Sequence, residues 1–336
     1  MKTLEEFNAF LDRQLNDELE SLEKQRIAGR NWVRRMWVVS LLPFAAFVFF
    51  IVRFSLQPAS GNEGNRTVVI AGLVLLVTLT GYAMRRFMMK QGGVNEATDY
   101  RHDFKQRIVK PLISFIHPDY QYQPLNHASY EEFTESGLFE KKAYQITGND
   151  QVYGKLGEMN FQFCDLTVMH MPLVTVRGQG PDTVFCGSYF IGQFPRYFST
   201  PVYVLSRNNS AAGEGYIQTW HLGKKVLPAD AAFNKLFMVY APDEVAAQQL
   251  LTPALMERMV ALHERTGARL FISFYNNRVY IGIDHGTDYF ETTLNKSLHN
   301  RQLLNNFFLD FMSMLQLAED LKSNLPIWTS CAFSPS

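Results

Sequence analysis

Residues 270–283, LFISFYNNRVYIGI, carry the clearest structural signal in this sequence. Two apolar segments with a period of two flank Asn276 and Asn277, and asparagine tolerates the positive φ that a two-residue hairpin turn needs. Pairing across this turn places three apolar pairs on one face: Leu270 with Ile283, Ile272 with Ile281 and Phe274 with Val279. A shift of one residue would expose that face. The sequence therefore predicts an antiparallel hairpin of fixed register with one buried apolar face.

One helix is expected before this hairpin in the sequence and another after it. Thr252 is a suitable N-cap, Pro253 suits the first helical position, and Gly267 ends a helix whose apolar side could cover the hairpin. A second helix, about residues 297–322, carries an apolar stripe wide enough to be buried on two sides. Further strands are predicted from a period of two at residues 159–164, 184–190, 202–205 and 236–240. These elements predict an α+β domain over residues 97–329, with an antiparallel sheet and packed helices.

Composition narrows the functional classes. The 336 residues contain 32 basic and 32 acidic side chains, so net charge gives no reason to expect a nucleic-acid partner. Only 19% of the residues are charged and 27 are phenylalanine, which excludes a solvated, disordered chain. Three cysteines without a CxxC pair exclude a disulfide framework and a thiolate zinc site. We expect a folded chain with no cofactor and no metal.

Two uncharged runs precede the α+β domain. Residues 36–52 and 67–84 contain no charged side chain, and as helices they would be about 25 and 27 Å long. These lengths lie at the short end of what spans a ~30 Å hydrocarbon core. Between Arg53 and Arg66, the twelve residues 54–65 are rich in turn formers and connect the two runs. The sequence therefore predicts a two-helix transmembrane hairpin over residues 35–90.

The distribution of arginine predicts how this hairpin is oriented. More basic residues lie before the first run and after the second than on the short connection, so both termini are predicted to be cytoplasmic. The lipid bilayer is then one expected partner, and arginines flank both runs at positions where they could reach its headgroups. The flanking residues are Arg34, Arg35, Arg53, Arg66, Arg85 and Arg86.

An amphipathic helix is predicted over residues 1–34, on the cytoplasmic side. Apolar residues recur there at spacings of three and four: Leu4, Phe7, Leu11, Leu15, Leu19 and Leu22. One interpretation is a coiled-coil or docking helix for a partner or a second copy of the chain. The other is a helix packed on its own cytoplasmic domain. The repeat is too short to decide between them.

Catalytic motifs are absent from the sequence. GxSxG, a P-loop, GxGxxG and HExxH do not occur. The best local cluster is residues 284–288, in which Asp284, His285 and Asp288 could move a proton or bind a metal. The alternative interpretation, which we favour, is a polar turn that leaves the hairpin, with Asp and Gly present for turn geometry.

Three further features bear on function. The aromatic stretch FCGSYFIGQFPRYF, residues 185–198, is typical of a core, but it would mark a partner surface if it were exposed. Asp150 and Asp165 are distant carboxylates that could join the 284–288 cluster in an acid–base site. A deep polar pocket holding three of these groups would indicate an enzyme, whereas a shallow aromatic patch would indicate a binding module.

Several segments together resemble a known family. They are DQVYG from Asp150 with FQFCDL, then residues 185–198, then FNKLFMVYAPDEVAAQQLLTPALMERM from Phe233, and ISFYNNRVYIGI from Ile272. Over about residues 99–328 the chain resembles the bacterial membrane proteins of domain-of-unknown-function family 3137. The resemblance implies the architecture above and a bacterial inner-membrane location. It implies no activity, ligand or catalytic residue.

Two functional hypotheses follow from the sequence. The first is a membrane-tethered cytoplasmic interaction or scaffold module of a bacterial inner-membrane complex, which binds a protein partner or itself through the N-terminal helix or an aromatic surface. The second is a membrane-associated enzyme that uses acid–base residues near positions 284–288. The lack of a catalytic motif favours the non-enzymatic hypothesis.

Overall fold

The computed structural model describes residues 2–55, 72, 81, 86, 100–139, 144–170, 181–207, 221–286, 297–321 and 328–329. Side chains are described throughout these ranges except at residues 36–48, 50–55 and 329. The chain divides into two compact units. Unit 1 comprises residues 1–10, 109–291 and 301–336, and unit 2 comprises residues 11–108 and 292–300.

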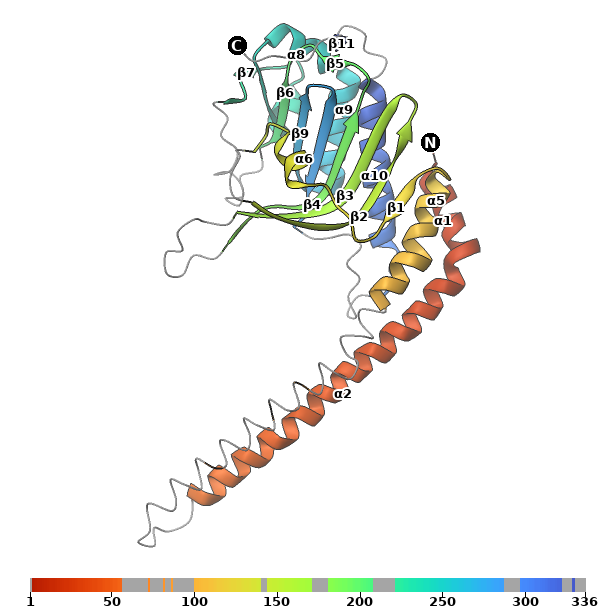
Figure 1. Ribbon diagram of the computed structural model, residues 1–336, viewed down its shortest axis with the longest axis vertical. Coiled ribbons are helices and arrows are strands. Elements are labelled where there is room, and N and C mark those ends of the chain that lie inside the picture. The colour runs from red at the N-terminus through yellow and green to blue at the C-terminus, as the bar shows by residue number, and fades with distance from the viewer. Residues whose placement is uncertain are drawn as a thin grey trace. The chain divides into compact units, whose positions relative to one another are not determined.

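Unit 1 is built around a nine-stranded sheet (Figure 1). The strands follow the order β1-β2-β3-β4-β10-β9-β6-β8-β7, and every neighbouring pair is antiparallel. Their bounds are β1 Gln121–Gln123, β2 Tyr144–Leu156, β3 Met159–His170, β4 Asp182–Gln193, β6 Val202–Ser206, β7 Lys224–Val226, β8 Phe237–Ala241, β9 Arg269–Tyr275 and β10 Arg278–Asp284. A separate pair consists of β5 Tyr197–Phe198 and β11 Trp328–Thr329.

Helices cover both faces of this sheet. They are α1 Leu4–Phe10, α5 Lys110–Ile116, α6 Tyr130–Thr134, α7 Ala231–Leu236, α8 Glu244–Leu250, α9 Pro253–Thr266 and α10 Gln302–Asp320. Figure 1 shows α6 on one side of the sheet and α9 and α10 on the other. Side chains alternate accordingly along β3: Cys164 packs in the same cluster as Phe133 of α6, whereas the Phe163 ring lies 5.1 Å from that of Phe311 on α10. The α+β class with an antiparallel sheet is thus confirmed.

The hairpin of β9 and β10 has the predicted register. Ile272 pairs with Ile281 and Phe274 with Val279, and Asn276 adopts a φ of 55° in the turn. The second face of the hairpin is buried as well, because α6 and the residues that follow α6 cover this face. Ser273 is fully buried there and donates a hydrogen bond of 2.5 Å to the carbonyl oxygen of Ser136. The hairpin therefore occupies the centre of the sheet and contributes to both cores.

The predicted start and end of the helix over residues 253–266 are also confirmed. The Thr252 side chain accepts a hydrogen bond from the Leu255 N–H, Pro253 opens α9, and Gly267 ends it with a φ of 61°. Ser129 and Glu132 form a reciprocal capping box at the start of α6. These local signals fix where α6 and α9 begin, and so determine which side chains they place against the sheet.

Unit 2 contains the long helix α2, Asn16–Ser55, which follows a π-helical turn at Leu11–Leu15. Arg107, on a second π-helical turn at Lys105–Val109, pairs with Glu18 of α2 and donates to Ser21 Oγ at 3.2 Å. The apolar stripe predicted for residues 1–34 is largely buried, since five of its residues are at most 4% exposed: Phe7, Leu11, Leu15, Leu19 and Leu22. A partner could dock on this stripe only after the stripe became exposed. Docking through it therefore stays a prediction.

The prediction of a two-helix transmembrane hairpin over residues 35–90 is wrong for the part of the chain that the structure describes. There, no helix combines the length and the apolar character needed to cross a bilayer. Residues 36–52 continue α2, but Arg35 and Arg53 limit the uncharged run to about 25 Å, against a ~30 Å hydrocarbon core. Of residues 67–84, the structure describes only Gly72 and Gly81.

The flanking arginines are placed only in part. Arg34 and Arg35 are exposed on α2, and Arg86 is exposed. Arg53 lies on α2 with no described side chain, and Arg66 and Arg85 fall outside the described residues. Contact of these arginines with lipid headgroups therefore stays a prediction.

A buried acid joins α2 to residues 297–298 within unit 2. The Glu23 carboxylate accepts hydrogen bonds from Arg26 Nε at 2.8 Å, Ser297 Oγ at 2.8 Å and the Leu298 N–H at 3.0 Å. The bond from Arg26 has the largest effect, and together with the bonds from Leu298 and Ser297 it outweighs burial. These contacts lower the pKa of Glu23 from 4.5 to about 2.

We expect acid to loosen this contact. Because the folded pKa of Glu23 is depressed, its stabilising contribution is complete above pH 4.5 and disappears as the pH falls towards 2. The shift corresponds to about 3 kcal/mol. Amide hydrogen exchange should show reduced protection at Leu298 at pH 2.5 relative to pH 6. Glu23→Gln should reproduce the loss at pH 7, whereas the exposed control Glu20→Gln should not; equal protection in the two variants would contradict the prediction.

Candidate functional site

The main candidate site is a polar hollow of about 690 Å³ on the α6 side of the sheet in unit 1. It is lined by the adjoining ends of five neighbouring strands, β1, β2, β3, β4 and β10, together with α6. Most of its lining is polar: Asp119, Gln121, Gln123, Glu132, Gln151, Tyr153, Lys155, Asn160, Gln162, Gln193 and Arg278, with Gly154, Phe161 and Ile191. It therefore lies on the same face of the sheet as the apolar core that α6 covers, and its polar side chains line a hollow next to that core. We call it the polar hollow.

Hydrogen bonds between side chains organise one part of the polar hollow. Tyr153 OH accepts from Gln123 Nε2 at 2.8 Å and donates to Gln121 Oε1 at 2.7 Å. In a second series of hydrogen bonds, Gln151 Nε2 donates to Gln162 Oε1 at 2.8 Å, and Gln162 Nε2 donates to Glu132 Oε1 at 2.5 Å. Since Glu132 also closes the capping box of α6, these hydrogen bonds connect the start of the helix to the sheet.

A row of four side chains crosses the strands at the other part of the polar hollow. Lys155 lies opposite Asn160, Asn160 opposite Gln193, and Gln193 opposite Arg278. Arg278 pairs with Glu135. Lys155, Asn160 and Gln193 are exposed, and their side chains make no hydrogen bond or ion pair to any residue that the structure describes. These three groups are available to a ligand.

The bend in β2 that shapes this face has a local cause. Asp150 adopts a φ of 57°, and the pairing of β2 with β3 shifts register between Asn149 and Val152. The buried Asp150 carboxylate accepts a hydrogen bond from Tyr122 OH, which ties the bulge to β1. Four residues later, a Cβ on Gly154 would meet the Tyr120 ring at 2.5 Å, so only glycine fits there. Backbone geometry thus explains both the aspartate and the glycine of the DQVYG segment that begins at Asp150.

The predicted acid–base cluster does not assemble at the polar hollow. Asp284, at the end of β10, pairs with Arg269 and accepts hydrogen bonds from the N–H groups of Cys186 and Gly286, each at 3.3 Å. Gly286 has a φ of 69°. This geometry is that of the polar turn, the interpretation that the sequence favoured. Asp288 lies outside the described residues.

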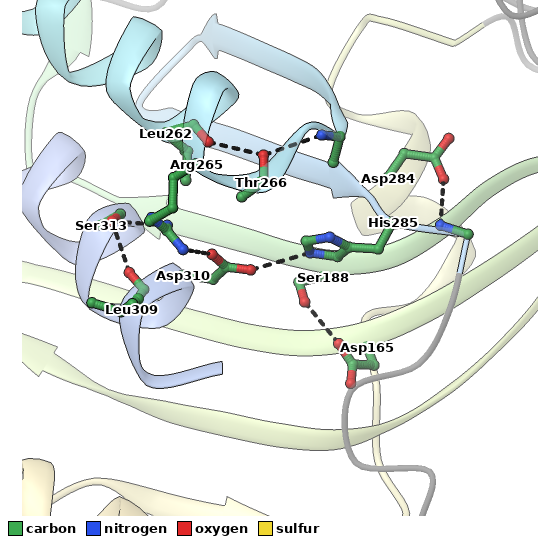
Figure 2. A network of polar contacts seen from close by, with 12 residues as sticks. Asp165, Ser188, Leu262, Arg265, Thr266, Asp284, His285, Leu309, Asp310 and Ser313 are labelled. Atoms are coloured by element: carbon green, nitrogen blue, oxygen red, sulfur yellow. Dashed lines mark hydrogen bonds and ion pairs between the residues drawn. The ribbon is translucent and has the colours of Figure 1, made fainter. Parts of the chain in front are cut away.

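His285 instead belongs to a buried polar contact that the sequence did not predict (Figure 2). Its Nε2 lies 3.3 Å from Oδ2 of Asp310, which is fully buried on α10. The other oxygen of Asp310 pairs with Arg265 of α9, whose Nη2 also donates to Ser313 Oγ at 3.2 Å. The contact thus joins the end of β10 to both helices. A buried carboxylate is costly unless it is paired, and here it has an arginine and an imidazole beside it.

The two distant carboxylates that we considered for catalysis occupy separate environments. Asp165 of β3 is buried and accepts a hydrogen bond of 2.9 Å from Ser188 Oγ of β4, on the α10 side of the sheet (Figure 2). Asp150 is bonded to Tyr122 as described above. None of these carboxylates, nor His285, lines the polar hollow. Within the described residues, no group of three or more His, Cys, Asp or Glu side chains could hold a metal ion.

The remaining candidates are mostly core residues. Burial raises the pKa of the Cys164 thiol well above its ordinary value, so this thiol does not form a thiolate at neutral pH. Five aromatic side chains of the stretch 185–198 are buried, namely Phe185, Tyr189, Phe190, Phe194 and Phe198. That stretch therefore forms core and presents little aromatic surface.

Residues 183–323, which run from β4 to the end of α10, match the model of a family described as a protein of unknown function, DUF3137. This segment of the chain is thus similar to the DUF3137 family. This confirms the resemblance drawn from the sequence, over a shorter range than residues 99–328. The DUF3137 segment contains the hairpin, Arg265 and Asp310, but only the β4 and β10 side of the polar hollow. The family description states no activity, ligand or location.

Other comparisons add little to the DUF3137 assignment. No curated protein matches the chain. Among solved structures, it is similar to the mycobacterial trehalose monomycolate transport factor A, TtfA, with 10% sequence identity and a TM-score of 0.34, covering 66% of this chain and 94% of that one. A similarity at this level supports no conclusion about the fold or the function of the present chain.

Proposed function

We propose that this chain is a non-enzymatic interaction module and that the polar hollow is its binding face. One observation carries the proposal: five strands leave an open hollow of about 690 Å³ whose lining offers Lys155, Asn160 and Gln193 without partners among the described residues. Exposed groups that can donate and accept hydrogen bonds, held on a rigid sheet, are suited to recognition.

The enzymatic alternative has a weaker basis. Its strongest support is the contact of His285 with Asp310, because an imidazole beside a carboxylate is a common acid–base pair. Asp310 is fully buried and the His285 side chain is only 10% exposed, however, and the polar hollow lies on the opposite side of the sheet from α10. Asp310 is also neutralised by Arg265. The arrangement suits a structural contact better than proton transfer to a substrate.

Site-specific photo-crosslinking tests the binding face. A benzophenone amino acid would be placed in the full chain at Asn160 or Gln193, both exposed in the polar hollow, and at Val245 of α8 as a control. Val245 is 65% exposed and lies in the same unit. We expect the first two positions to yield one shared crosslinked protein that Val245 does not yield. Identical products at all three positions, or none at Asn160 and Gln193, would refute the proposed binding face.

We further propose that the module works at the bacterial inner membrane, with the lipid bilayer as a second partner. The support is the sequence alone, namely Arg34, Arg35, Arg85 and Arg86, which could contact anionic lipid headgroups at the membrane surface. Fractionation of bacterial cells at low ionic strength tests the location. The protein is expected in the membrane fraction, and its complete recovery in the soluble fraction would count against this location.

A further inference from the structure

The charge of the polar hollow is balanced. Its lining contains two acidic side chains, Asp119 and Glu132, and two basic ones, Lys155 and Arg278. Arg278 is already paired with Glu135, which lies beside the polar hollow on the α6 side. Phosphate groups and nucleic acids require an excess of lysine and arginine, which this face does not have. A ligand without net charge fits best.

The dimensions of the polar hollow suit a chain rather than a compact molecule. Its lining extends over five adjacent strands. With about 4.8 Å between strands, four spacings cover about 19 Å, the length of about six residues of extended polypeptide. A peptide lying across the strands would follow the row formed by Lys155, Asn160, Gln193 and Arg278.

The unpartnered side chains of this row match the peptide group chemically. The carboxamides of Asn160 and Gln193 each offer two donors and one acceptor, so each can form two hydrogen bonds with a backbone N–H and C=O. The two residues lie opposite one another on β3 and β4. The apolar lining is small, because Phe161 and Ile191 are each only 4% exposed. A segment with large apolar side chains would gain little burial here.

We propose that the polar hollow binds an extended, uncharged, polar peptide segment of a protein partner, whose backbone pairs with the carboxamides of Asn160 and Gln193. The segment is about six residues long and rich in Ser, Thr, Asn, Gln and Gly. Lys155 donates to a backbone or side-chain oxygen at one end of the row. This inference rests on the proposed function and specifies the chemistry of the partner.

Selection of displayed random peptides on the immobilised full chain tests this proposal. We expect the enriched peptides to contain runs of about six uncharged polar residues. The double variant Asn160→Ala/Gln193→Ala changes only exposed side chains, and it should lower capture of the enriched peptides about tenfold, since it removes two to four hydrogen bonds. The control Glu158→Ala, an exposed residue in the turn between β2 and β3, should leave capture unchanged.

The outcomes separate this proposal from the proposed function. Enrichment of charged or apolar peptides, no enrichment, or capture that is insensitive to the double variant would overturn the peptide proposal. If the Asn160 crosslink to a partner persists in that case, the binding face stands and the partner contacts it in another way. Loss of both the crosslink and the peptide binding would refute the peptide proposal and the proposed binding face together.

Discussion

Replacing Asp310 by alanine is expected to lower the free energy of unfolding by about 3–5 kcal/mol. Asp310 is fully buried between Arg265 of α9 and His285 after β10. Its removal leaves the guanidinium and the imidazole without their acceptor and leaves a cavity between α10 and the sheet. Both effects act on the same junction, so the loss should exceed that of an ordinary surface substitution.

Urea unfolding of the full chain, followed by tryptophan fluorescence, measures this loss. The control is Glu257→Ala, which removes an exposed carboxylate from α9 and should change the free energy of unfolding by no more than about 0.5 kcal/mol. Combining Asp310→Ala with Arg265→Ala should cost less than the sum of the two single changes, because the two residues form one contact. A loss below about 1 kcal/mol for Asp310→Ala would show that the contact is not structural.

Phe311→Ala is expected to cost about as much, 3–5 kcal/mol, by a different mechanism. The Phe311 ring is fully buried on α10 and packs against Phe163 at 5.1 Å, Phe307 at 5.8 Å and Phe161 at 6.0 Å between ring centroids. Truncation removes apolar burial and opens a cavity where α10 meets β3. The surrounding aromatic rings are rigid and can only partly fill it.

The same urea unfolding experiment with Phe311→Leu provides the comparison. Leucine keeps most of the buried apolar volume, so we expect Phe311→Leu to cost less than half as much as Phe311→Ala. Val245→Ala at the exposed surface of α8 should have almost no effect. Equal losses for Phe311→Leu and Phe311→Ala would mean that ring contacts, rather than filled volume, stabilise α10 on the sheet.

Local signals in the sequence were enough to predict part of the fold. The hairpin register followed from the segregation of apolar side chains around Asn276, and α9 followed from its cap at Thr252 and its stop at Gly267. Each of these depends only on neighbouring residues. The transmembrane hairpin was inferred from charge-free runs at the lower limit of length, and run length alone did not establish a spanning helix.

Strand β2 shows why other elements were missed. Its sequence, YQITGNDQVYGKL, places Gly148, Asn149 and Asp150 in the middle of the strand, a composition typical of a turn. In the structure this segment is a bulge within a continuous strand, stabilised by the contact of Asp150 with Tyr122. That contact joins residues 28 positions apart and has no signature in a single sequence.

The candidate site was missed for the same reason. The polar hollow combines residues from positions 119 to 278, which become neighbours only when β10 pairs with β4. Likewise, the residues next to Asp310 in the sequence do not indicate its role. Its partners come from a separate helix and from the residue after a strand. Polar side chains scattered along a chain do not reveal which of them share a face.

The strand order has a consequence for how the protein is made. β1 to β4 are consecutive neighbours, and β6, β7 and β8 form another group, but only the late hairpin of β9 and β10 connects the two groups. A ribosome that has translated the chain up to residue 268 has therefore produced two sheet fragments with unpaired edges. Such edges invite pairing with other chains. Nascent chains stalled before this hairpin should depend on chaperones, and that dependence should end once the last central strand has left the exit tunnel.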